Sequence, residues 1–527
     1  MAKKIHLNAL WKQFISKGYV FLLVVLLGVQ LPDVATGQSA QRMVINVDQS
    51  EEVINKHIYG HFAEHLGRGI YDGLWREDDE GNFHIRQDIV DALKAIQIPN
   101  IRWPGGCFAD YYFWEYGIGP VEERPSIINV LWGGVVDNNA VGTHEFMELV
   151  DALETEPIIV GNVGSGTVQE MARWWEYMTH PGPGSMADLR KENGREDPWN
   201  VHYWGVGNES WGCGGHMRPQ FYADLYKQFA TFLHPMGDSE PFRIAAGAAG
   251  DDYEWTEVLM REAGHMMEGL DLHHYTITGS WETKKGEALD FTEAEYVELM
   301  EGAQFFDELL YRHKSIMDVY DPEKRVWLIV GEWGTWHEPL EGTNPGFLHQ
   351  QNALRDALTA SVSFDMFHRH LDRVKMANIA QTVNVLQAMI LTDEDQMILT
   401  PTYHVFEFYT VHHDADYLSF YLDAGEYVYD DIVLEAVTAT ASRNDDGVHV
   451  TMTNVDPHES RRIEIDLRGD EFRQVSGRIL TADALNAHNT FEQPDVVSPQ
   501  TFNGARFSDG KLVVDLPAKS LIVLKLR

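Results

Sequence analysis

Two glutamates in this sequence have the surroundings that hydrolysis of a glycosidic bond requires. Glu209 and Glu332 each end an apolar run of strand length, and Trp211 and Trp333 lie close beside them. Such hydrolysis needs two carboxyl groups, one to protonate the leaving oxygen and one to attack the anomeric carbon or activate water. One glutamate alone at a strand end is more often a structural ion-pair partner. Two of them, each among Trp and Gly, favour a catalytic pair.

The elements that must position this pair alternate between strand and helix from residue 56 to 400. Apolar runs predict strands at residues 57–64, 98–103, 157–162, 201–208, 242–247, 270–275, 325–332 and 374–385. Helical spacing lies between them at residues 85–96, 144–153, 168–178, 220–233 and 349–368. This pattern predicts a (β/α)8 TIM barrel, whose active site lies at the C-terminal ends of the strands. Glu209 ends the fourth predicted strand and Glu332 the seventh.

Beyond about residue 425 the pattern changes to a period of two, as at residues 448–452 and 463–467. Alternation of this kind is typical of antiparallel strands with one buried face. We therefore expect a C-terminal antiparallel β-sandwich of the jelly-roll type. The predicted division is a signal peptide at 1–40, a strand at 41–55 that joins the sandwich, a barrel at 56–400 and the sandwich at 401–527.

The first forty residues have the composition of an export signal. Lysines precede an apolar run at residues 19–31, and small residues follow it. The run has about a dozen residues, whereas a membrane span needs roughly twenty. The sequence thus predicts a periplasmic or extracellular protein that is not inserted in a membrane after cleavage.

Charge and cysteine content narrow the possible partners. Asp and Glu number 81 against 41 Lys and Arg, a net charge of -40, which disfavours nucleic acid and anionic membranes as ligands. The surplus fits either an ordinary solvated surface or adaptation to high salt. Cys107 and Cys213 are the only cysteines. A bridge between them is conceivable, but sequence does not give the separation of their Cα atoms, and we expect two free thiols.

The chain resembles glycoside hydrolase family 51, whose members are chiefly α-L-arabinofuranosidases. The similarity extends over nearly the whole chain after residue 40, and its most specific motifs are GHFAEHLGR at 60–68, RWPGG at 102–106 and AHNTFE at 487–492. The resemblance implies that Glu209 is the general acid/base and Glu332 the nucleophile of a retaining enzyme. The implied substrates are terminal non-reducing α-L-arabinofuranosyl groups of arabinan, arabinoxylan or arabino-oligosaccharides from plants. It also implies a homo-oligomer, often a hexamer.

Further site residues follow from the same resemblance. Those implied to contact the sugar or the nucleophile are Glu64, Cys107, Asn208, Tyr275, Trp336 and Gln381, and those implied to orient the carboxylates are Arg102 and His273. Many family members have Asn where this chain has Cys107, and a thiol is a weak hydrogen-bond partner. That contact and the substrate preference that depends on it are therefore left open. A salt bridge to Arg68 or Arg102 is the alternative interpretation of Glu64.

Other functions were weighed against this one. The string HFAEH at 61–65 matches a zinc-protease motif, but glycines bracket it and it lies on a strand rather than a helix, so no metal is expected. No cofactor is expected either. The rivals are a barrel β-glycanase of the endoglucanase kind, which would use the same Glu pair in a cleft, and a catalytically silent carbohydrate-binding protein.

Overall fold

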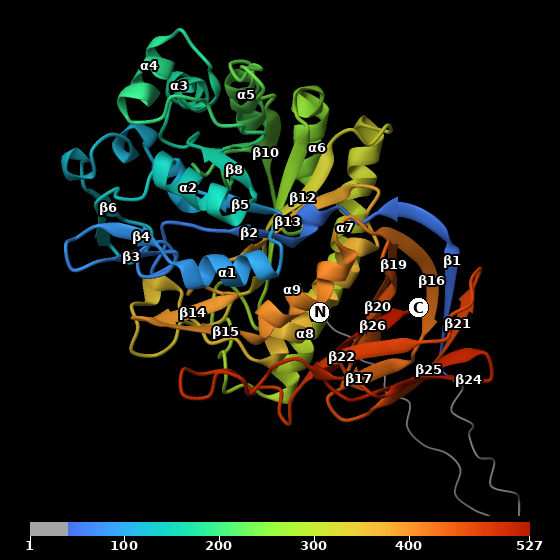
Figure 1. Cartoon of the computed structure of the whole chain (residues 1–527). Helices are drawn as coiled ribbons and strands as arrows, with labels where there is room; N and C mark the ends of the chain where they lie inside the picture. Colours follow the sequence, from blue (N-terminus) through green and yellow to red (C-terminus); the bar gives the residue numbers. More distant parts are fainter. Residues whose placement is uncertain (1–40) are drawn as a thin grey trace, which may run out of the picture. The chain divides into compact units, whose positions relative to one another are not determined.

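A closed barrel of parallel strands organises the part of the chain that the structure, a computed structural model, describes, namely residues 41–527 (Figure 1). Around the barrel the strands follow the order β10, β11, β12, β13, β2, β5, β8 and β9. Their bounds are β2 (Gly60–Phe62), β5 (Asn100–Trp103), β8 (Glu156–Gly161), β9 (Tyr203–Val206), β10 (Phe242–Ala249), β11 (Gly269–Thr276), β12 (Trp327–Thr335) and β13 (Val374–Ala380). The predicted eight-stranded barrel is confirmed.

These segments form barrel strands because they are apolar enough to be buried on both faces. Every residue of β5 and β9 is buried, as is all of β12 except its first residue. A parallel strand with a filled barrel on one side and helices on the other has no solvent face. The strands β2 and β13 are shorter than predicted, because residues 56–59 form a 3-10 turn and the chain leaves the barrel after Ala380.

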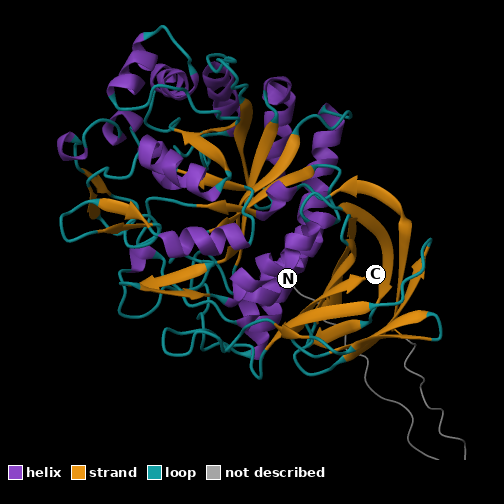
Figure 2. Cartoon of the chain, viewed as in Figure 1, coloured by secondary structure: helices purple, strands orange, loops and turns teal. Residues whose placement is uncertain are grey.

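Helices surround the barrel as crossover connections (Figure 2). They are α1 (Gln87–Ala95), α2 (Thr143–Leu153), α3 (Val168–Thr179), α4 (Ser185–Glu192), α5 (Pro219–Ala230), α6 (Tyr253–Ala263), α7 (Glu293–Tyr320), α8 (Leu354–His368) and α9 (Pro401–Tyr409). The five predicted helices correspond to α1, α2, α3, α5 and α8. The sequence analysis missed α4, α6, α7 and α9, although α7 begins with a capping box in which Thr292 accepts a hydrogen bond from the amide of Glu295.

A ten-stranded sheet is the second large sheet of the described chain. Its order is β23, β22, β26, β20, β19, β16, β1, β21, β25 and β24. The pair β1 and β21 is parallel and the other pairs are antiparallel. The bounds are β1 (Gln41–Val53), β16 (Asp416–Asp423), β19 (Val437–Asn444), β20 (Gly447–Asn454), β21 (Arg461–Arg468), β22 (Val475–Thr481), β23 (Gln500–Thr501), β24 (Ala505–Ser508), β25 (Lys511–Leu516) and β26 (Ser520–Leu526).

Four small hairpins complete the described elements. They are β3 (Trp75–Glu77) with β4 (Phe83–Ile85), β6 (Ile127–Asn129) with β7 (Val135–Asp137), β14 (Ile390–Asp393) with β15 (Gln396–Leu399), and β17 (Glu426–Tyr429) with β18 (Ile432–Glu435). The predicted signal peptide lies outside the described residues. Within residues 41–527, we find no helix with the length and apolar character needed to cross a membrane.

Helix α8 joins the barrel to the sheet. It contacts β12 on one side and β19, β20 and β26 on the other, and each of its residues is buried. Phe364 lies at the centre of this junction with its ring 5.1 Å from that of Trp333 and 5.0 Å from those of Tyr59, Phe406 and Tyr409, measured between ring centroids. One aromatic ring therefore packs against residues of a barrel strand, a 3-10 helix and an α-helix at once.

We predict that Phe364→Ala lowers the free energy of unfolding by about 3–5 kcal/mol, because a fully buried ring is replaced by a cavity. Urea unfolding followed by fluorescence measures the change. Phe232→Ala is the matched control, since Phe364 is 0% exposed and Phe232 is 51% exposed. The control should change stability by less than about 0.5 kcal/mol. Equal losses in the two variants would contradict a central packing role for Phe364.

Candidate active site

Two glutamates meet at the C-terminal edge of the barrel. Glu332 lies on β12 and Glu209 lies just beyond β9, while His273 on β11 lies between them. Nδ1 of His273 is 2.9 Å from Oε1 of Glu209 and 3.6 Å from Oε1 of Glu332. An oxygen of Glu209 and an oxygen of Glu332 lie within 4.8 Å of each other. This fits the separation of about 5–5.5 Å between the carboxyl groups of retaining glycosidases better than the larger separation of inverting ones.

A tight turn after β9 aims Glu209 into the barrel mouth. Gly207 has a φ of 81° and Glu209 a φ of 40°, so both lie in the left-handed region. A non-glycine residue there carries a conformational cost, which is common where a side chain must be held in one direction. Asp110 holds this turn against the loop after β8, because its carboxylate accepts hydrogen bonds from the amides of Val163, Gly164 and Asn208.

Charged and polar donors hold Glu332 from two sides. Nη1 of Arg102 donates to Oε1 of Glu332 over 2.8 Å, and the hydroxyl of Tyr275 donates to Oε2 over 2.8 Å. The other guanidinium nitrogen of Arg102 donates to Oδ1 of Asn208, and its plane lies over the ring of Phe62. Burial lowers the pKa of Arg102, but the charges of Glu332, Asp271 and Glu64 and the hydrogen bond to Glu332 together outweigh that effect and raise it. The guanidinium thus remains a cation in the barrel mouth.

Neutral donors surround Glu64. Its Oε1 accepts from the amides of Gly106 and Phe108 over 3.1 and 3.0 Å and from the indole of Trp132 over 3.0 Å. Its Oε2 accepts from Nε2 of Gln381 over 3.0 Å. The alternative interpretation, a salt bridge from Glu64 to Arg68 or Arg102, is wrong. Among the described residues, no ion pair within 4.0 Å joins either arginine to this carboxylate, and Arg102 pairs with Glu332. A carboxylate held by such donors suits recognition of sugar hydroxyls.

Burial and charge set the protonation of the site. Burial raises the pKa of Glu64 to about 7, and the charge of Glu332 adds to this rise. Burial also raises the pKa of Glu209, against the hydrogen bond from His273. In His273 burial lowers the pKa, but the charges of Glu332 and Asp271 outweigh it and raise the pKa to about 10. A protonated imidazole therefore donates to Asp271 through Nε2 and to Glu209 through Nδ1.

The structure brings the predicted site residues together at the barrel mouth. Hydrogen bonds or direct contacts link Arg102, Cys107, Asn208, Glu209, His273, Tyr275, Glu332 and Trp336. Glu64, which is bonded to Gln381, lies near enough for the charge of Glu332 to raise its pKa. The sequence analysis missed Asp110, Trp132 and Asp271. Asp271 had a signal, because it precedes His273 by two residues on a strand and so shares its face. Trp132 lies in the β6–β7 hairpin, and no strand-end argument points to it.

The expectation of two free thiols is wrong. Cys107 and Cys213 form a disulfide, with their Cα atoms 5.6 Å apart. Asp110 explains how residues so distant in sequence meet, since its carboxylate binds the amide of Asn208 and so joins the loop after β5 to the loop after β9. Oε2 of Glu209 lies 3.4 Å from Sγ of Cys213 and 3.7 Å from Sγ of Cys107. A bridged sulfur has no hydrogen, so these are contacts and not hydrogen bonds.

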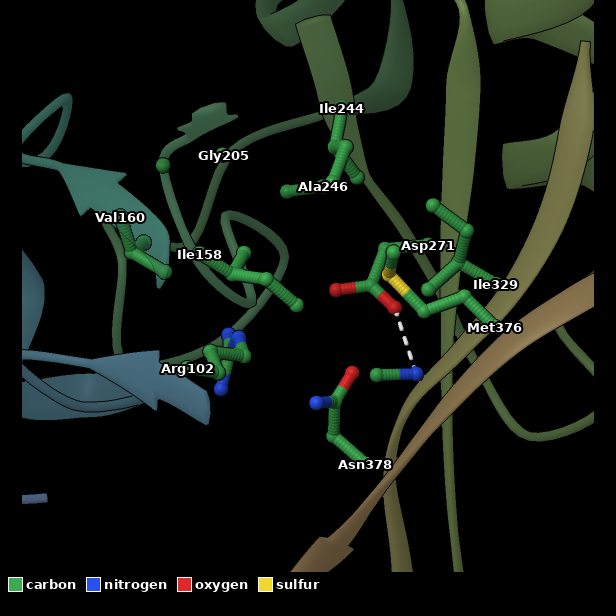
Figure 3. Close-up of a pocket in the computed structure, with 12 residues that line it drawn as sticks. Arg102, Ile158, Val160, Gly205, Ile244, Ala246, Asp271, Ile329, Met376 and Asn378 are labelled. Atoms are coloured by element: carbon green, nitrogen blue, oxygen red, sulfur yellow. Dashed lines mark hydrogen bonds between the residues drawn. The ribbon is translucent and has the colours of Figure 1, made fainter. Parts of the chain in front are cut away.

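Two cavities adjoin this site and differ greatly in size. One of about 620 Å³ opens beside Glu209 and has aromatic walls from Trp211, Trp281 and Trp336. The rings of Trp281 and Trp336 meet edge to face with centroids 5.2 Å apart. The other cavity, of about 10 Å³, lies inside the barrel, and Figure 3 shows Arg102, Asp271 and Asn378 around it. The amide of Gly331, which also lines this cavity, donates to Asp271. Only the larger cavity has room for part of a glycan.

Comparison with known proteins gives consistent matches along the chain. The family described as "Alpha-L-arabinofuranosidase 1 domain" matches residues 92–292, and "Alpha-L-arabinofuranosidase C-terminal domain" matches residues 331–520. A Bacteroides ovatus protein named intracellular exo-alpha-L-arabinofuranosidase is 48% identical over 93% of this chain and 96% of its own. The crystal structure of a GH51 arabinofuranosidase from Xanthomonas axonopodis pv. citri has a TM-score of 0.90 at 47% identity, covering 92% of this chain and all of that one (100%).

The prediction of export is wrong on this comparison. An Acetivibrio thermocellus protein named intracellular exo-alpha-(1->5)-L-arabinofuranosidase is 27% identical over 92% of this chain and 99% of its own, and the B. ovatus relative is also named intracellular. The prediction depended on lysines followed by a short apolar run. That composition is required of a signal peptide but is not specific to one, so it was weak evidence for a periplasmic or extracellular protein.

We predict that the unreduced protein has no reactive thiol even when unfolded. Iodoacetamide added in guanidinium should leave its mass unchanged, whereas prior reduction should allow two additions, because the sequence contains 2 cysteines. Intact mass spectrometry reads the result. Two additions without reduction would show that the bridge does not form in the isolated protein.

Proposed function

The chain belongs to glycoside hydrolase family 51, and we propose that Glu332 is its nucleophile and Glu209 its general acid/base. It is an exo-α-L-arabinofuranosidase, the activity for which its relatives are named. The assignment depends on one observation, the pairing of the two carboxyl groups, which have oxygens within 4.8 Å of each other. In this pair Glu332 accepts hydrogen bonds from two strong donors, and Glu209 has a raised pKa.

The donors on Glu332 suit a nucleophile. Arg102 and Tyr275 each donate to a different oxygen of Glu332, which stabilises the carboxylate as an anion and fixes its plane. Burial raises the pKa of Tyr275, so its hydroxyl stays protonated and keeps donating. A fixed anionic carboxylate is positioned to attack the anomeric carbon and form a glycosyl ester.

The surroundings of Glu209 suit a proton donor. Burial raises its pKa, and its Oε1 is occupied by Nδ1 of His273. The acid proton is therefore carried on Oε2, which contacts the disulfide. Glu209 is one of the residues that line the larger cavity. When Glu332 attacks, Oε2 gives its proton to the departing oxygen.

The second half of the reaction reverses the role of Glu209. Formation of the ester at Glu332 removes a negative charge that raises the pKa of Glu209. The pKa of Glu209 then falls, and its carboxylate takes a proton from the water that attacks the ester. Two displacements at one carbon return the sugar with its original anomeric configuration.

The residues beside Glu332 and those beside Glu209 suit different parts of a substrate. Glu64, Gln381 and Asn208 line the side of Glu332, where their oxygens and nitrogens suit the hydroxyls of an arabinofuranosyl ring. The aromatic cavity lies on the side of Glu209, where the leaving group must be. Aromatic faces there suit the sugars of a glycan chain. We propose arabinan, arabinoxylan and their oligosaccharides as substrates, with Cys107 contributing its backbone and Trp336 a wall.

We also propose a homo-oligomer, with the hexamer that the family resemblance implies as the form to test. The apolar side chains of Ile128, Val130 and Val136 are 56%, 61% and 66% exposed on the β6–β7 hairpin. A cluster of this kind on a described surface is a candidate contact between copies. The alternative functions, a β-glycanase and a silent binding protein, are not retained, since relatives that cover nine-tenths of the chain are named arabinofuranosidases.

Azide rescue tests the roles of the two glutamates. With a nitrophenyl arabinofuranoside, Glu209→Ala should lower turnover by about 100-fold or more and lower KM as well, because the glycosyl-enzyme forms but is hydrolysed slowly. Azide needs no general base and should restore turnover, giving the α-configured glycosyl azide. Glu332→Ala lacks the nucleophile, so direct displacement by azide should give the β anomer. NMR of the products distinguishes the two anomers. If Glu209→Ala gave the β anomer and Glu332→Ala the α anomer, the roles assigned to the two glutamates would have to be exchanged.

The pH dependence tests the position of His273. His273→Asn keeps a donor near Glu209 but removes a cation beside Glu209, Asp271 and Glu332, so carboxylate anions there become less stable. Both limbs of the kcat/KM profile should move to higher pH by about one unit. His274→Asn is the matched control, because burial lowers the pKa of His274 to about 4 and leaves it uncharged at the working pH.

Stability should respond to the same change. The pKa of His273 rises from 6.5 to about 10 on folding, so its stabilising contribution is complete below pH 6.5 and is lost as the pH rises towards 10. The wild type should therefore lose stability over that range, and His273→Asn should show a smaller loss in urea unfolding. If His273→Asn changed neither the pH profile of kcat/KM nor the dependence of the unfolding free energy on pH, His273 would not be charged in the folded protein.

A further inference from the structure

The sulfurs of Cys107 and Cys213 lie against the oxygen of Glu209 that carries the acid proton. Oε2 is 3.7 Å from the first sulfur and 3.4 Å from the second. Each of the three residues is partly exposed, and the three candidate ligand atoms lie within 4.8 Å of one another. Thiols and a carboxylate so arranged are a ligand set for a divalent cation, except that the sulfurs are bonded to each other.

The distances match a tetrahedral site for a soft metal. With Zn–S of about 2.3 Å and Zn–O of about 2.0 Å, ligand sulfur and oxygen atoms lie about 3.5 Å apart. The observed contacts of 3.4 and 3.7 Å bracket this value. The two sulfurs must separate after reduction, and side-chain rotation is enough, because the Cα atoms are 5.6 Å apart and the loop is anchored independently by Asp110.

We propose that reduction of the Cys107–Cys213 bridge creates a binding site for Zn²⁺ or Cd²⁺ in which both thiolates and Glu209 are ligands, and that the bound metal blocks catalysis. The inhibitory part depends on the role of Glu209 given above. The bridge then protects the acid/base in the oxidised protein, and its reduction exposes the enzyme to control by soft cations.

The steps balance as ordinary thiol and metal chemistry. A dithiol reductant gives two electrons and two protons to the bridge, so the S–S bond breaks, two thiols form and the reductant becomes a disulfide. The cation then displaces the protons of both thiols and the proton of Glu209, and it binds Sγ, Sγ and Oε2. A water molecule suits the fourth position. Glu209 then has no proton to give and no free carboxylate to act as a base.

The sulfur site suits a soft cation better than the neighbouring oxygens and nitrogen do. Glu209, His273 and Glu332 also lie close enough to share an ion. However, the imidazole of His273 is protonated between Asp271 and Glu209, and Arg102 already pairs with Glu332. A cation there would have to displace a proton and meet a guanidinium. Thiolate ligands, in contrast, select for Zn²⁺ and similar ions.

The experiment compares the full chain in its two redox states. One sample is reduced with dithiothreitol and freed of it by anaerobic gel filtration, because the reductant itself binds metal; the other sample stays oxidised. Both are titrated with CdCl₂, and bound metal, thiolate-to-cadmium absorbance in the ultraviolet and arabinofuranosidase activity are measured. We expect one Cd²⁺ per reduced chain, loss of activity in proportion to occupancy and recovery with EDTA. The oxidised chain should bind at least about 100-fold more weakly.

Variants identify the ligands. Cys213→Ser leaves a single thiol, so its reduced form should lose the absorbance band and bind Cd²⁺ at least about 100-fold more weakly. Glu209→Gln keeps both thiols and should keep the band with weaker binding. Thermal unfolding shows whether each variant is folded, and the comparison of oxidised with reduced wild type does not depend on any variant.

Three results would overturn the proposal. Equal binding in the two redox states would place the metal elsewhere, such as between Glu209, His273 and Glu332. Absence of binding by the reduced chain would exclude the site. Binding at one Cd²⁺ per chain without loss of activity would exclude Glu209 as a ligand. A chain without arabinofuranosidase activity would instead refute the proposed function, and the absorbance titration would still decide whether the metal site exists.

Discussion

The barrel mouth buries more negative charge than its cations can balance, and the rest of the site depends on this constraint. Glu64, Glu209, Asp271 and Glu332 face one another there, and Arg102 and His273 are the cations among them. An ionised carboxylate without a partner is costly to bury. Burial accordingly raises the pKa of Glu64 to about 7 and also raises that of Glu209. In the proposed mechanism, the proton that Glu209 donates is retained because the site has too few cations to expel it.

Arg102 distributes this limited positive charge by its geometry. Its guanidinium donates to Glu332 and Asn208 through different nitrogens and rests on the ring of Phe62. A planar fork of donors orients two acceptors at once, which the single ammonium of lysine does not do. The strand explains its direction, since β5 is buried throughout and alternate residues face the barrel interior. A residue two positions earlier, Asn100, points the same way and bonds His57 and Asn378.

The predictable part of the site is the part set by strands. Glu209 and Glu332 follow from strand ends and flanking residues, because a parallel barrel brings every such end to one face. Asn208 was implied only by the family resemblance. Contacts made by loops were not predictable. Trp132 reaches Glu64 from a hairpin, and the bridge between Cys107 and Cys213 requires two loops to converge through the carboxylate of Asp110. Helix α7 was missed although its residues are clearly helical, because its many acidic residues hid the apolar face that packs on the barrel.

The bridge is also consistent with the proposed role of Glu209 as an acid in the oxidised protein. A free thiol or an asparagine beside Oε2 would donate a hydrogen bond, which stabilises the carboxylate and lowers its pKa. A bridged sulfur has no hydrogen to give, so it contacts Oε2 without stabilising the anion. His273 meanwhile binds the other oxygen, Oε1, and fixes which oxygen carries the proton. In the proposed mechanism, the bridged sulfur of Cys107, where the family resemblance implied an asparagine, thus favours the protonated form of Glu209.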